Sequence, residues 1–466
     1  MSRFTPPYPK PMPRRPGILK TLLQPMKFWR SRYDALSALM DRSYSMHMGE
    51  IRMLFRRMYI VNQPDLIRRV FIDEFAKYPK SRMVAHMLEI LMGNSMFVSN
   101  GEVWKRQRRM MEPVFAQARI KLVFDLMLDA VKDMLARVDA LATGRPVQIE
   151  LEMTHVTADI IYRTIFSKPL GAEDARVIYT AFMDFQEAAY DHGMVRVTGF
   201  PDFMTRGMQK RARASARDIR AVLDPHVIAR YEAAQRGEMG NESDILSAMI
   251  AARDPVDGTP FTLAELCEQV AMMFLAGHET TASSLSWALY LLANDMEVRG
   301  RLHAQTVSVF GDRDPQFSDM KRLPLAWNVF RESLRLYPPI PFLPRQATEQ
   351  ACMRDKTIAP GSIVSVSPWL MHHHRRHWAN PDEFDPDRFD RPESEESQRC
   401  AYMPFGLGPR VCLGASFAMQ EGVLILACLA RRYRIEPDPA HEPKAIGRIT
   451  VRSENGVRVK LSRREA

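Results

Sequence analysis

The most informative ten residues of the chain read Phe405-Gly406-Leu407-Gly408-Pro409-Arg410-Val411-Cys412-Leu413-Gly414. Glycines at 406 and 408 permit a tight turn close to a flat ligand, because glycine adopts backbone conformations that other residues avoid. Arg410 places a planar fork of donors, suited to a carboxylate, two residues before the sulfur of Cys412. The stretch therefore predicts a loop that presents one sulfur and one guanidinium to a ligand.

An apolar helix over 416–433 is predicted directly after this loop. Its first turn carries the positive end of the helix dipole and free N–H groups, which favour a thiolate over a thiol at Cys412. Gly414 lets the backbone of this new helix approach a neighbour closely. A lone cysteine behind a glycine turn usually acts only as a small hydrophobe. The whole pattern, and not the cysteine by itself, indicates a ligand site.

A long buried helix is predicted over 262–293. It begins with Thr262-Leu263-Ala264-Glu265, a capping box, and stays apolar almost throughout, which is typical of a central helix. Its middle carries Ala276-Gly277-His278-Glu279-Thr280-Thr281, a poor helix sequence by propensity. The Thr280 hydroxyl can bond the Ala276 carbonyl and open a local groove. Considered alone, this segment is equally well explained as a kinked core helix.

Two further pairs have helical spacing. Glu332 and Arg335 lie three apart and can pair on one helix face, and Arg388 in Pro386-Asp387-Arg388-Phe389 can complete a buried network. Trp104 and Arg108 lie four apart and project from one face of another predicted helix. Each pair is common by chance, so only their combination with the cysteine loop carries weight.

Together these motifs resemble the cytochrome P-450 family. The family's W-x-x-x-R, A-G-x-D/E-T, E-x-x-R and cysteine-loop patterns occur here in the family's order and cover most of the chain. The resemblance implies a mainly α fold, a triangular α-rich prism with a small β-rich lobe. A haem b (iron protoporphyrin IX) would lie between the distal helix and the cysteine loop. Glu332, Arg335 and Arg388 would lock the core behind that loop.

The resemblance also assigns roles to individual residues. Cys412 would be the axial metal ligand, and Glu279 and Thr280 would be the catalytic pair that delivers protons to bound dioxygen. The haem carries two carboxylates that are costly to bury unpaired, so arginine and tryptophan donors would hold them. The expected cofactor-binding residues are Trp104, Arg108, Ala276, Gly277, Arg345, Phe405, Gly408, Arg410 and Gly414.

The implied activity is that of a haem-thiolate monooxygenase, which inserts one atom of dioxygen into a hydrophobic organic substrate. An electron-rich thiolate ligand favours cleavage of the O–O bond. Electrons would come indirectly from NAD(P)H through separate proteins, an acidic ferredoxin and its reductase. The ferredoxin would meet basic side chains at Lys105, Arg106, Arg109, Arg431 and Arg432. A peroxygenase that uses hydrogen peroxide, or a haem sensor without turnover, is disfavoured by the acid and threonine at 279 and 280.

Composition limits the other function classes. A formal charge of +10 predicts acidic partners. Because the basic residues are dispersed and no nucleic-acid-binding motif occurs, we do not expect the protein to bind nucleic acid. No apolar run is long enough for a transmembrane anchor, and the N-terminus lacks the apolar core of a signal peptide. We therefore expect a cytoplasmic protein, with a proline-rich basic segment over 1–16 and a single catalytic domain over 17–466.

Two local features complete the prediction. The cluster from His372 to His377 invites a metal-site hypothesis, but histidines in an extended strand would point to opposite faces and the flanking arginines would repel a cation. By analogy with the family, the substrate pocket would be lined by largely apolar residues, which indicates a hydrophobic organic molecule and little more. This wall would comprise 83–97, Phe274, Leu275, 340–343 and a turn near Thr450.

Overall fold

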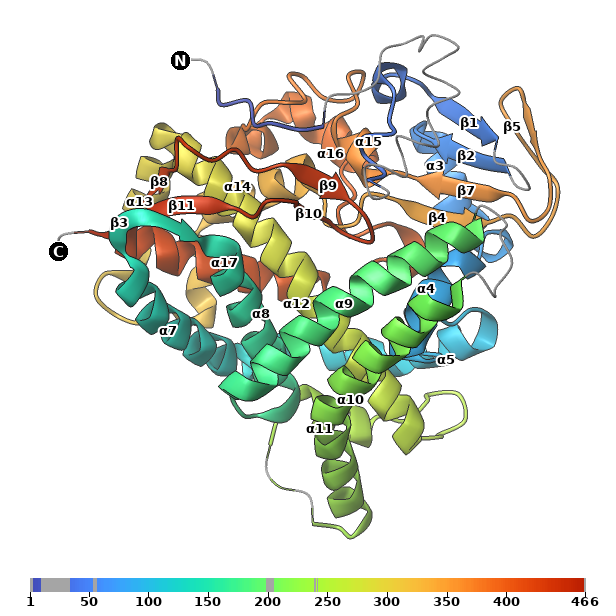
Figure 1. Cartoon of the computed structure of the whole chain (residues 1–466), viewed down its shortest axis with the longest axis horizontal. Helices are drawn as coiled ribbons and strands as arrows, with labels where there is room; N and C mark the ends of the chain where they lie inside the picture. Colours follow the sequence, from blue (N-terminus) through green and yellow to red (C-terminus); the bar gives the residue numbers. More distant parts are fainter. Residues whose placement is uncertain are drawn as a thin grey trace.

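The computed structural model describes residues 3–9, 34–52, 57–197, 205–238, 240 and 242–464. Helices make up most of the body, and the long helix α12 (Leu263–Asn294) crosses its middle, in contact with α8, α10, α14 and α17 (Figure 1). The small strands lie at the edges of this helical body. This arrangement confirms the predicted mainly α fold.

Helix α12 begins where the sequence predicted. The Thr262 hydroxyl accepts the Glu265 backbone N–H (3.2 Å), and the Glu265 carboxylate accepts the Thr262 N–H (2.9 Å), so both halves of the capping box form. Most side chains of α12 are buried, which agrees with the apolar sequence of a central helix. The predicted helix over 262–293 is therefore confirmed to within one residue at each end.

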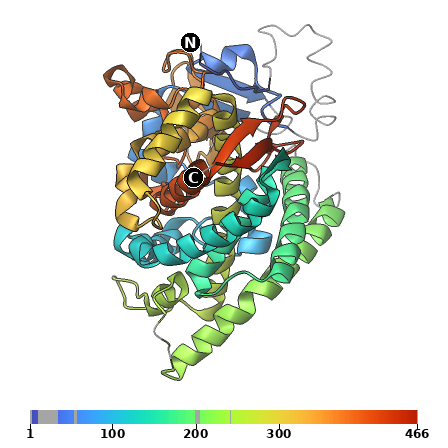
Figure 2. The same ribbon diagram turned by 90° about the vertical axis from the view of Figure 1, so that its left-hand side faces the viewer.

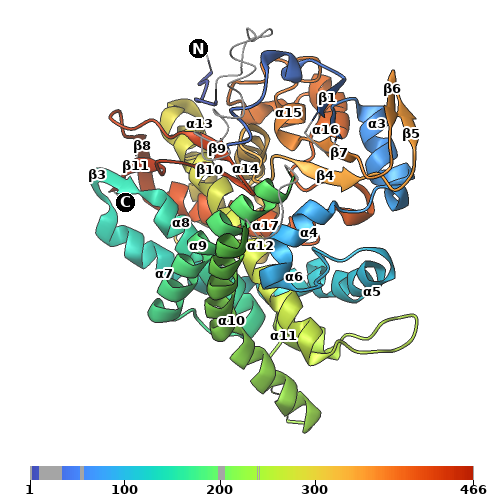
Figure 3. The same cartoon turned by 45° about the vertical axis from the view of Figure 1, so that its right-hand side comes forward.

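The other helices pack around α12. Helices α9 and α10 lie side by side, and α10 projects below the rest of the body (Figures 2 and 3). The helix predicted over 416–433 is α17. The bounds are α3 (Pro64–Arg68), α4 (Arg82–Met92), α5 (Gly101–Met111), α6 (Gln117–Leu122), α7 (Phe124–Leu141), α8 (Ile149–Phe166), α9 (Ala172–Val197), α10 (Arg206–Gln235), α11 (Ile245–Ala251), α13 (Met296–Phe310), α14 (Pro324–Leu336), α15 (Pro368–His372), α16 (Glu395–Ala401) and α17 (Ala415–Arg432).

One sheet has the strand order β1-β2-β7-β4, in which β2 and β7 are parallel and the other neighbours antiparallel. Its strands are β1 (Met48–Arg52), β2 (Arg57–Val61), β7 (Ile363–Val366) and β4 (Leu343–Gln346), and the hairpin β5 (Ala351–Met353) and β6 (Lys356–Ile358) extends beside it. Residues 53–56, between β1 and β2, lie outside the described residues.

The C-terminal strands form a second group. A three-stranded sheet has the order β3-β11-β8, and β9 pairs with β10. Strand β10 begins at Val451, because the Arg448 N–H donates to the Thr450 carbonyl in a turn just before it (3.0 Å). The bounds are β3 (Thr143–Gln148), β8 (Tyr433–Pro437), β9 (Ala445–Gly447), β10 (Val451–Ser453) and β11 (Arg458–Arg463).

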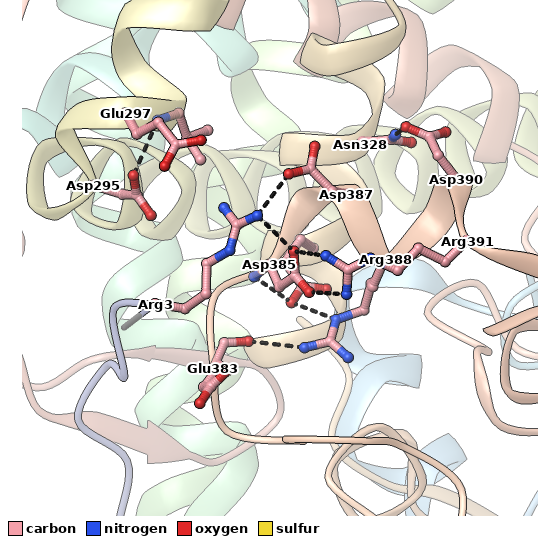
Figure 4. Close-up of polar contacts among 12 residues, drawn as sticks. Arg3, Asp295, Glu297, Asn328, Glu383, Asp385, Asp387, Arg388, Asp390 and Arg391 are labelled. Atoms are coloured by element: carbon pink, nitrogen blue, oxygen red, sulfur yellow. Dashed lines mark hydrogen bonds and ion pairs between the residues drawn. The ribbon is translucent and has the colours of Figure 1, made fainter. Parts of the chain in front are cut away.

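Residues 3–9 lie against the helical body. The Arg3 guanidinium reaches Asp387 (2.7 Å) and Asp385 (3.4 Å), as Figure 4 shows, and the Tyr337 hydroxyl donates to the Pro7 carbonyl (2.6 Å). The predicted domain boundary at residue 16 lies outside the described residues. Within the part of the chain that the structure describes, every helix is too short or too polar to cross a bilayer.

Candidate active site

The cysteine loop connects α16 to α17 and turns back on itself. The Cys412 N–H donates to the Phe405 carbonyl (2.9 Å), and the Val411 N–H donates to the Gly408 carbonyl (3.0 Å). Gly406 and Gly408 both have positive φ angles, 76° and 67°, which confirms the predicted tight turn. The turn leaves the sulfur of Cys412 three residues ahead of α17.

Gly408 is required for packing as well as for its φ angle. A Cβ atom there would lie 2.1 Å from the Phe71 carbonyl oxygen, so the close approach is made to protein backbone. At Gly414 no protein atom lies within 4 Å of the corresponding position. The close approach predicted at Gly414 is therefore not made to another part of the described chain.

The thiol of Cys412 keeps an exposed surface, although protein surrounds it on most sides. This burial raises the pKa of Cys412, while the Gly414 N–H and the charges of Arg108 and Lys80 lower it. Burial is the largest of these effects. Burial therefore opposes the predicted thiolate preference, which the Gly414 N–H and the two cations support.

Cationic side chains gather beside this loop. Arg345 is buried, and its guanidinium stacks over Phe71 at 4.4 Å and donates to the Pro344 carbonyl (3.3 Å). Burial lowers the pKa of Arg345 to about 10. Arg410 bonds the Ser99 carbonyl (3.0 Å) and the Asn100 side chain (2.8 Å). Burial, then Arg345 and Arg108, lowers the pKa of Arg410 to about 9.

Lys80 belongs to the same cluster, and the sequence analysis missed it. Its Nζ donates to the Phe97 carbonyl (2.5 Å), and burial, followed by repulsion from Arg345 and Arg410, lowers its pKa well below the ordinary value. Within the described chain, Lys80, Arg345 and Arg410 have no carboxylate partner, whereas Arg108 pairs with Glu112 (2.7 Å). Like charges held together without anions are costly, so this cluster is suited to an anionic ligand.

Trp104 is buried at the edge of the cluster. The Arg410 guanidinium lies 4.1 Å from the centre of its ring, and Phe75 meets that ring edge-on. Arg108, one helical turn further along α5, donates to the Val411 carbonyl (2.8 Å) and so reaches the residue next to Cys412. The predicted donors Trp104, Arg108, Arg345 and Arg410 are therefore brought together at one end of the loop.

The middle of α12 shows the hydrogen bond that the sequence predicted. The Thr280 hydroxyl donates to the Ala276 carbonyl (2.7 Å), four residues back. Gly277 packs against α8, where a Cβ atom would lie 3.3 Å from the Ile161 side chain. The Thr157 hydroxyl of α8 also donates to the His278 carbonyl (2.9 Å). Several α12 carbonyls are thus shared with side chains, although the helix is continuous from 263 to 294.

The Glu279 side chain contacts α9 and the β9–β10 turn, whereas the Thr280 hydroxyl bonds within α12. Its carboxylate accepts hydrogen bonds from the Thr450 hydroxyl (2.7 Å) in the β9–β10 turn and from the Gln186 amide of α9. Burial raises the pKa of Glu279, and these two donors and Arg452 lower it by a smaller amount. The acid is therefore held by contacts that no local sequence motif encodes.

The family profile described as "Cytochrome P450" matches residues 7–460. The chain belongs to the cytochrome P450 family. Among its relatives, "Cyclooctatin synthase" of Streptomyces melanosporofaciens is 32% identical over 390 residues, 84% of this chain and 83% of the relative. "Cyclooctat-9-en-7-ol 5-monooxygenase" of the same organism is 29% identical over 429 residues, 91% and 89% of the two chains. "Crystal structure of cytochrome P450DA heme domain" matches with a TM-score of 0.79 at 24% identity, covers 90% of each chain and shares the fold.

Membership of the cytochrome P450 family makes the chain a haem-thiolate monooxygenase by class, and the site fits that cofactor. Haem brings two carboxylates and an iron that binds a thiolate. Arg345, which is buried, and Lys80 and Arg410, which are partly buried, are cations without a carboxylate partner in the described chain, and Cys412 is the exposed sulfur beside them. The chemistry of these donors therefore matches the charges of the cofactor.

The E-x-x-R network behind the loop forms as expected. Glu332 is fully buried, and its carboxylate accepts from Arg335 (2.8 Å) and Arg388 (2.9 Å). The Arg335 carbonyl bonds the ring of His372 (3.1 Å), whose other nitrogen accepts the Met403 N–H (2.9 Å). These bonds connect the network to the segment that leads into the cysteine loop.

The histidine cluster differs from its predicted form. The expected extended strand is wrong, because Pro368 starts the short helix α15, which ends at His372. The His373 ring bonds the Trp369 carbonyl (2.9 Å) and the His374 ring bonds the Met46 carbonyl (3.2 Å). Each of these buried rings has its own backbone partner, so the histidines serve packing.

Four of the five basic side chains expected to meet an electron donor form ion pairs within the described chain, and the fifth bonds backbone carbonyls. The Arg431 guanidinium bonds two backbone carbonyls, those of Gly311 and Arg313. The prediction missed these partners because most of them lie far away in sequence. Lys105 pairs with Glu102 (2.7 Å), Arg106 with Glu265 (2.6 Å), Arg109 with Asp254 (2.9 Å) and Arg432 with Asp139.

Proposed function

We propose that this cytochrome P450 hydroxylates a hydrophobic organic substrate, with Cys412 as the axial ligand of haem b and Glu279 and Thr280 as its proton-delivering pair. The observation that carries the proposal is the cluster of Lys80, Arg345 and Arg410, cations that have no carboxylate partner among the described residues and lie beside the exposed Cys412 sulfur. When bound, the haem supplies the activation of dioxygen. The chain supplies the cavity, the charges and the protons.

Protons would reach the site along α12. The Glu279 carboxyl, whose pKa burial raises, can donate a proton at near-neutral pH more readily than an exposed glutamate. The Thr280 hydroxyl, which already donates to Ala276, keeps its lone pairs free to accept a hydrogen bond from water. Glu279 is thus proposed as the source of the proton and Thr280 as the group that directs it.

The substrate would lie against apolar side chains of α12. Phe274 and Leu275, which precede Thr280 by six and five residues, are buried, and the β9–β10 turn at Thr450 approaches the same helix. One relative is named for the 5-monooxygenation of cyclooctat-9-en-7-ol. We propose a hydrophobic substrate of comparable character for this chain, since few polar groups accompany these apolar walls.

Electrons would come from NAD(P)H through a separate reductase and an acidic ferredoxin. We propose that the ferredoxin docks beside Val411, which is 36% exposed next to Cys412, and on the exposed Arg119 and Lys121 of α6. Neither of these two cations has an ion pair within the described residues. They therefore attract an acidic partner more strongly than Lys105, Arg106 or Arg109, whose charges are already paired.

The axial role of Cys412 is tested by Cys412→Ser. A serine alkoxide is far harder to form than a thiolate, so the variant should lose the strongly red-shifted Soret band of the ferrous carbon monoxide complex. Retention of that band by the variant would show that Cys412 is not the ligand. A chain that binds haem through Cys412 but takes up no oxygen with NADH and a surrogate ferredoxin would instead be a sensor.

The pair at 279 and 280 is tested by Thr280→Ala. The variant should bind substrate and accept the first electron almost normally, because one small polar group is removed. Product formed per NADH should fall and hydrogen peroxide should rise, whereas Glu279→Gln should slow oxygen consumption itself. A peroxygenase would convert substrate with added hydrogen peroxide and would be indifferent to both substitutions.

A further inference from the structure

A groove runs along the exposed face of α10, the helix that projects from the body in Figure 3. It has a volume of about 780 Å³. Its lining residues are Ile90 of α4 and, from α10, Lys210, Arg213, Ala216, Arg217, Arg220, Ala221, Asp224, Pro225 and Ile228. Sites for small organic molecules typically have volumes of about 300 to 1,000 Å³. The groove is therefore large enough for a molecule of that kind.

The first half of the groove is cationic. Lys210, Arg213 and Arg217 follow one another at intervals of three or four residues, so their side chains share one side of α10. All three are exposed, and within the described part of the chain no ion pair or side-chain hydrogen bond engages them. Their charges therefore remain available to an anion from outside the chain.

The middle of the groove is fixed to the rest of the fold. Arg220 pairs with Asp224 (2.9 Å) and also donates to the Leu91 carbonyl (3.3 Å), so the Asp224 charge is already used. Asp224 also interacts with the Cys267 thiol of α12. Cys267 precedes Thr280 by 13 residues, which corresponds to about 20 Å along the helix. The groove is thus separate from the proposed active site.

The second half of the groove is apolar. It is formed by Ala221, Pro225 and Ile228, and Ile228 is 37% exposed. Pro225 lies inside α10 and has no N–H to donate to the Ala221 carbonyl, so the helical hydrogen bonds are interrupted where the groove becomes apolar. Ile228 follows Arg217 by 11 residues, or about 16 Å along the helix. Charge and apolar surface are therefore separated along the groove.

We propose that this groove binds a single-chain anionic amphiphile, such as a fatty acid carboxylate. The acid group lies between Arg213 and Arg217, because guanidinium groups bind carboxylates through paired, charge-assisted hydrogen bonds. The hydrocarbon chain extends toward Ile228. An acidic peptide would place charges along the apolar half as well, and the flat surface of a bilayer does not fill a groove. A single-chain amphiphile matches both halves.

The first test measures binding of laurate to the holoenzyme by equilibrium dialysis, below the concentration at which laurate forms micelles. The double variant Arg213→Gln with Arg217→Gln should weaken binding by about tenfold or more, since it removes the charge-assisted hydrogen bonds to the acid group. The matched control is Arg206→Gln with Arg211→Gln, two exposed cations of α10 that do not line the groove. Equal losses in the two double variants would reduce the effect to general charge attraction and overturn the proposal.

The second test separates the acid group from the chain. Dodecanamide, the neutral amide with the same chain, should bind about tenfold more weakly than laurate or worse, because the charge is lost. Octanoate should also bind about tenfold more weakly or worse, since each buried methylene improves binding by about fourfold. Ile228→Ser should reduce this preference for the longer chain. Equal binding of laurate and dodecanamide would show that the cations do not recognise the ligand.

The Soret band, recorded in the same samples, distinguishes the groove from the haem. Laurate in the groove should leave the band unchanged, whereas laurate that displaces water from the iron should shift it. If all laurate binding follows the Soret shift, the groove is empty and the proposal is wrong. The proposal is also wrong if phosphatidylglycerol vesicles or polyglutamate bind through Arg213 and Arg217 while laurate does not.

The result does not depend on the proposed function, because laurate binding at equilibrium needs neither electrons nor dioxygen. Loss of the thiolate spectrum in Cys412→Ser would leave the groove and its ligand unaffected. Conversely, a groove that binds no laurate would leave the proposed hydroxylation unaffected.

Discussion

Substitution of Glu332 by alanine is expected to be among the most damaging single changes in this protein. The Glu332 carboxylate accepts hydrogen bonds from Nε and Nη2 of Arg335 (2.8 Å each), from Nε of Arg388 (2.9 Å) and from the Asp385 backbone N–H (3.0 Å). Arg335 and Glu332 are 0% exposed and Arg388 is 3% exposed. Removal of the carboxylate leaves Arg335 and Arg388 without the counter-charge that both contact, although Asp385 still acts electrostatically on Arg388.

The size of the loss in stability depends on which hydrogen bonds the two guanidinium groups retain. Truncation of one partner of a buried pair costs about 3 to 5 kcal/mol. Arg335 retains the carbonyls of His372, Pro381 and Glu383, at 2.6 to 3.1 Å, so its donors are not all orphaned. We therefore expect Glu332→Ala to lower the free energy of unfolding by about 4 kcal/mol, and Glu332→Gln, which keeps one acceptor oxygen, by about half of that.

The assay is urea unfolding of the holoenzyme, followed by circular dichroism and by the haem absorbance. Haem should be lost at a lower urea concentration than helix in Glu332→Ala, because His372 links the Arg335 carbonyl to the Met403 N–H before the cysteine loop. The control Glu383→Ala removes a carboxylate that only meets the Asn380 side chain (3.2 Å) and should change stability by less than about 0.5 kcal/mol. A loss below about 1 kcal/mol in Glu332→Ala would refute the reasoning.

Three further predictions concern single charges. Arg345→Leu should make haem dissociate faster, as followed by transfer to apomyoglobin, because a buried cation without a carboxylate partner in the described chain is removed. Burial raises the pKa of Glu421 well above its ordinary value. The stability that the protonated carboxyl contributes is therefore present below about pH 4 and is lost as the pH rises. The melting temperature of Glu421→Gln should exceed that of the wild type by a margin that increases between pH 5 and 8. Charge reversal at Arg119 and Lys121 should slow reduction by an acidic ferredoxin at low salt, and more than reversal of Lys105 does, because Lys105 already pairs with Glu102.

Features that depend on neighbours in the sequence could be predicted. The capping box at Thr262 and Glu265 joins groups three residues apart, and the Thr280 bond to Ala276 spans one helical turn. The tight turn at Gly406 likewise depends on local backbone freedom. Such short-range interactions are specified by residue type and spacing, so the central helix and the cysteine loop were placed correctly.

Features that depend on distant contacts could not be predicted. Lys80 carries no motif, and it joins the cationic cluster because its backbone forms a bridge with Arg345. Arg109 looked like a free surface charge, but the fold brings Asp254, 145 positions away, to its guanidinium. A sequence shows which side chains are charged, but only the chain path shows which of those charges are already neutralised.

The acid and the hydroxyl at 279 and 280 show why adjacency in sequence does not mean contact. Successive α-helical side chains diverge by about 100°, so Glu279 reaches Gln186 and Thr450 while Thr280 bonds back to Ala276. A direct hydrogen bond between them would require Glu279 to leave both donors. A proton that passes from one to the other must therefore travel through water, or wait for the carboxyl to rotate. Under the proposed roles of Glu279 and Thr280, α9 and the β9–β10 turn would therefore influence proton delivery through their hydrogen bonds to Glu279.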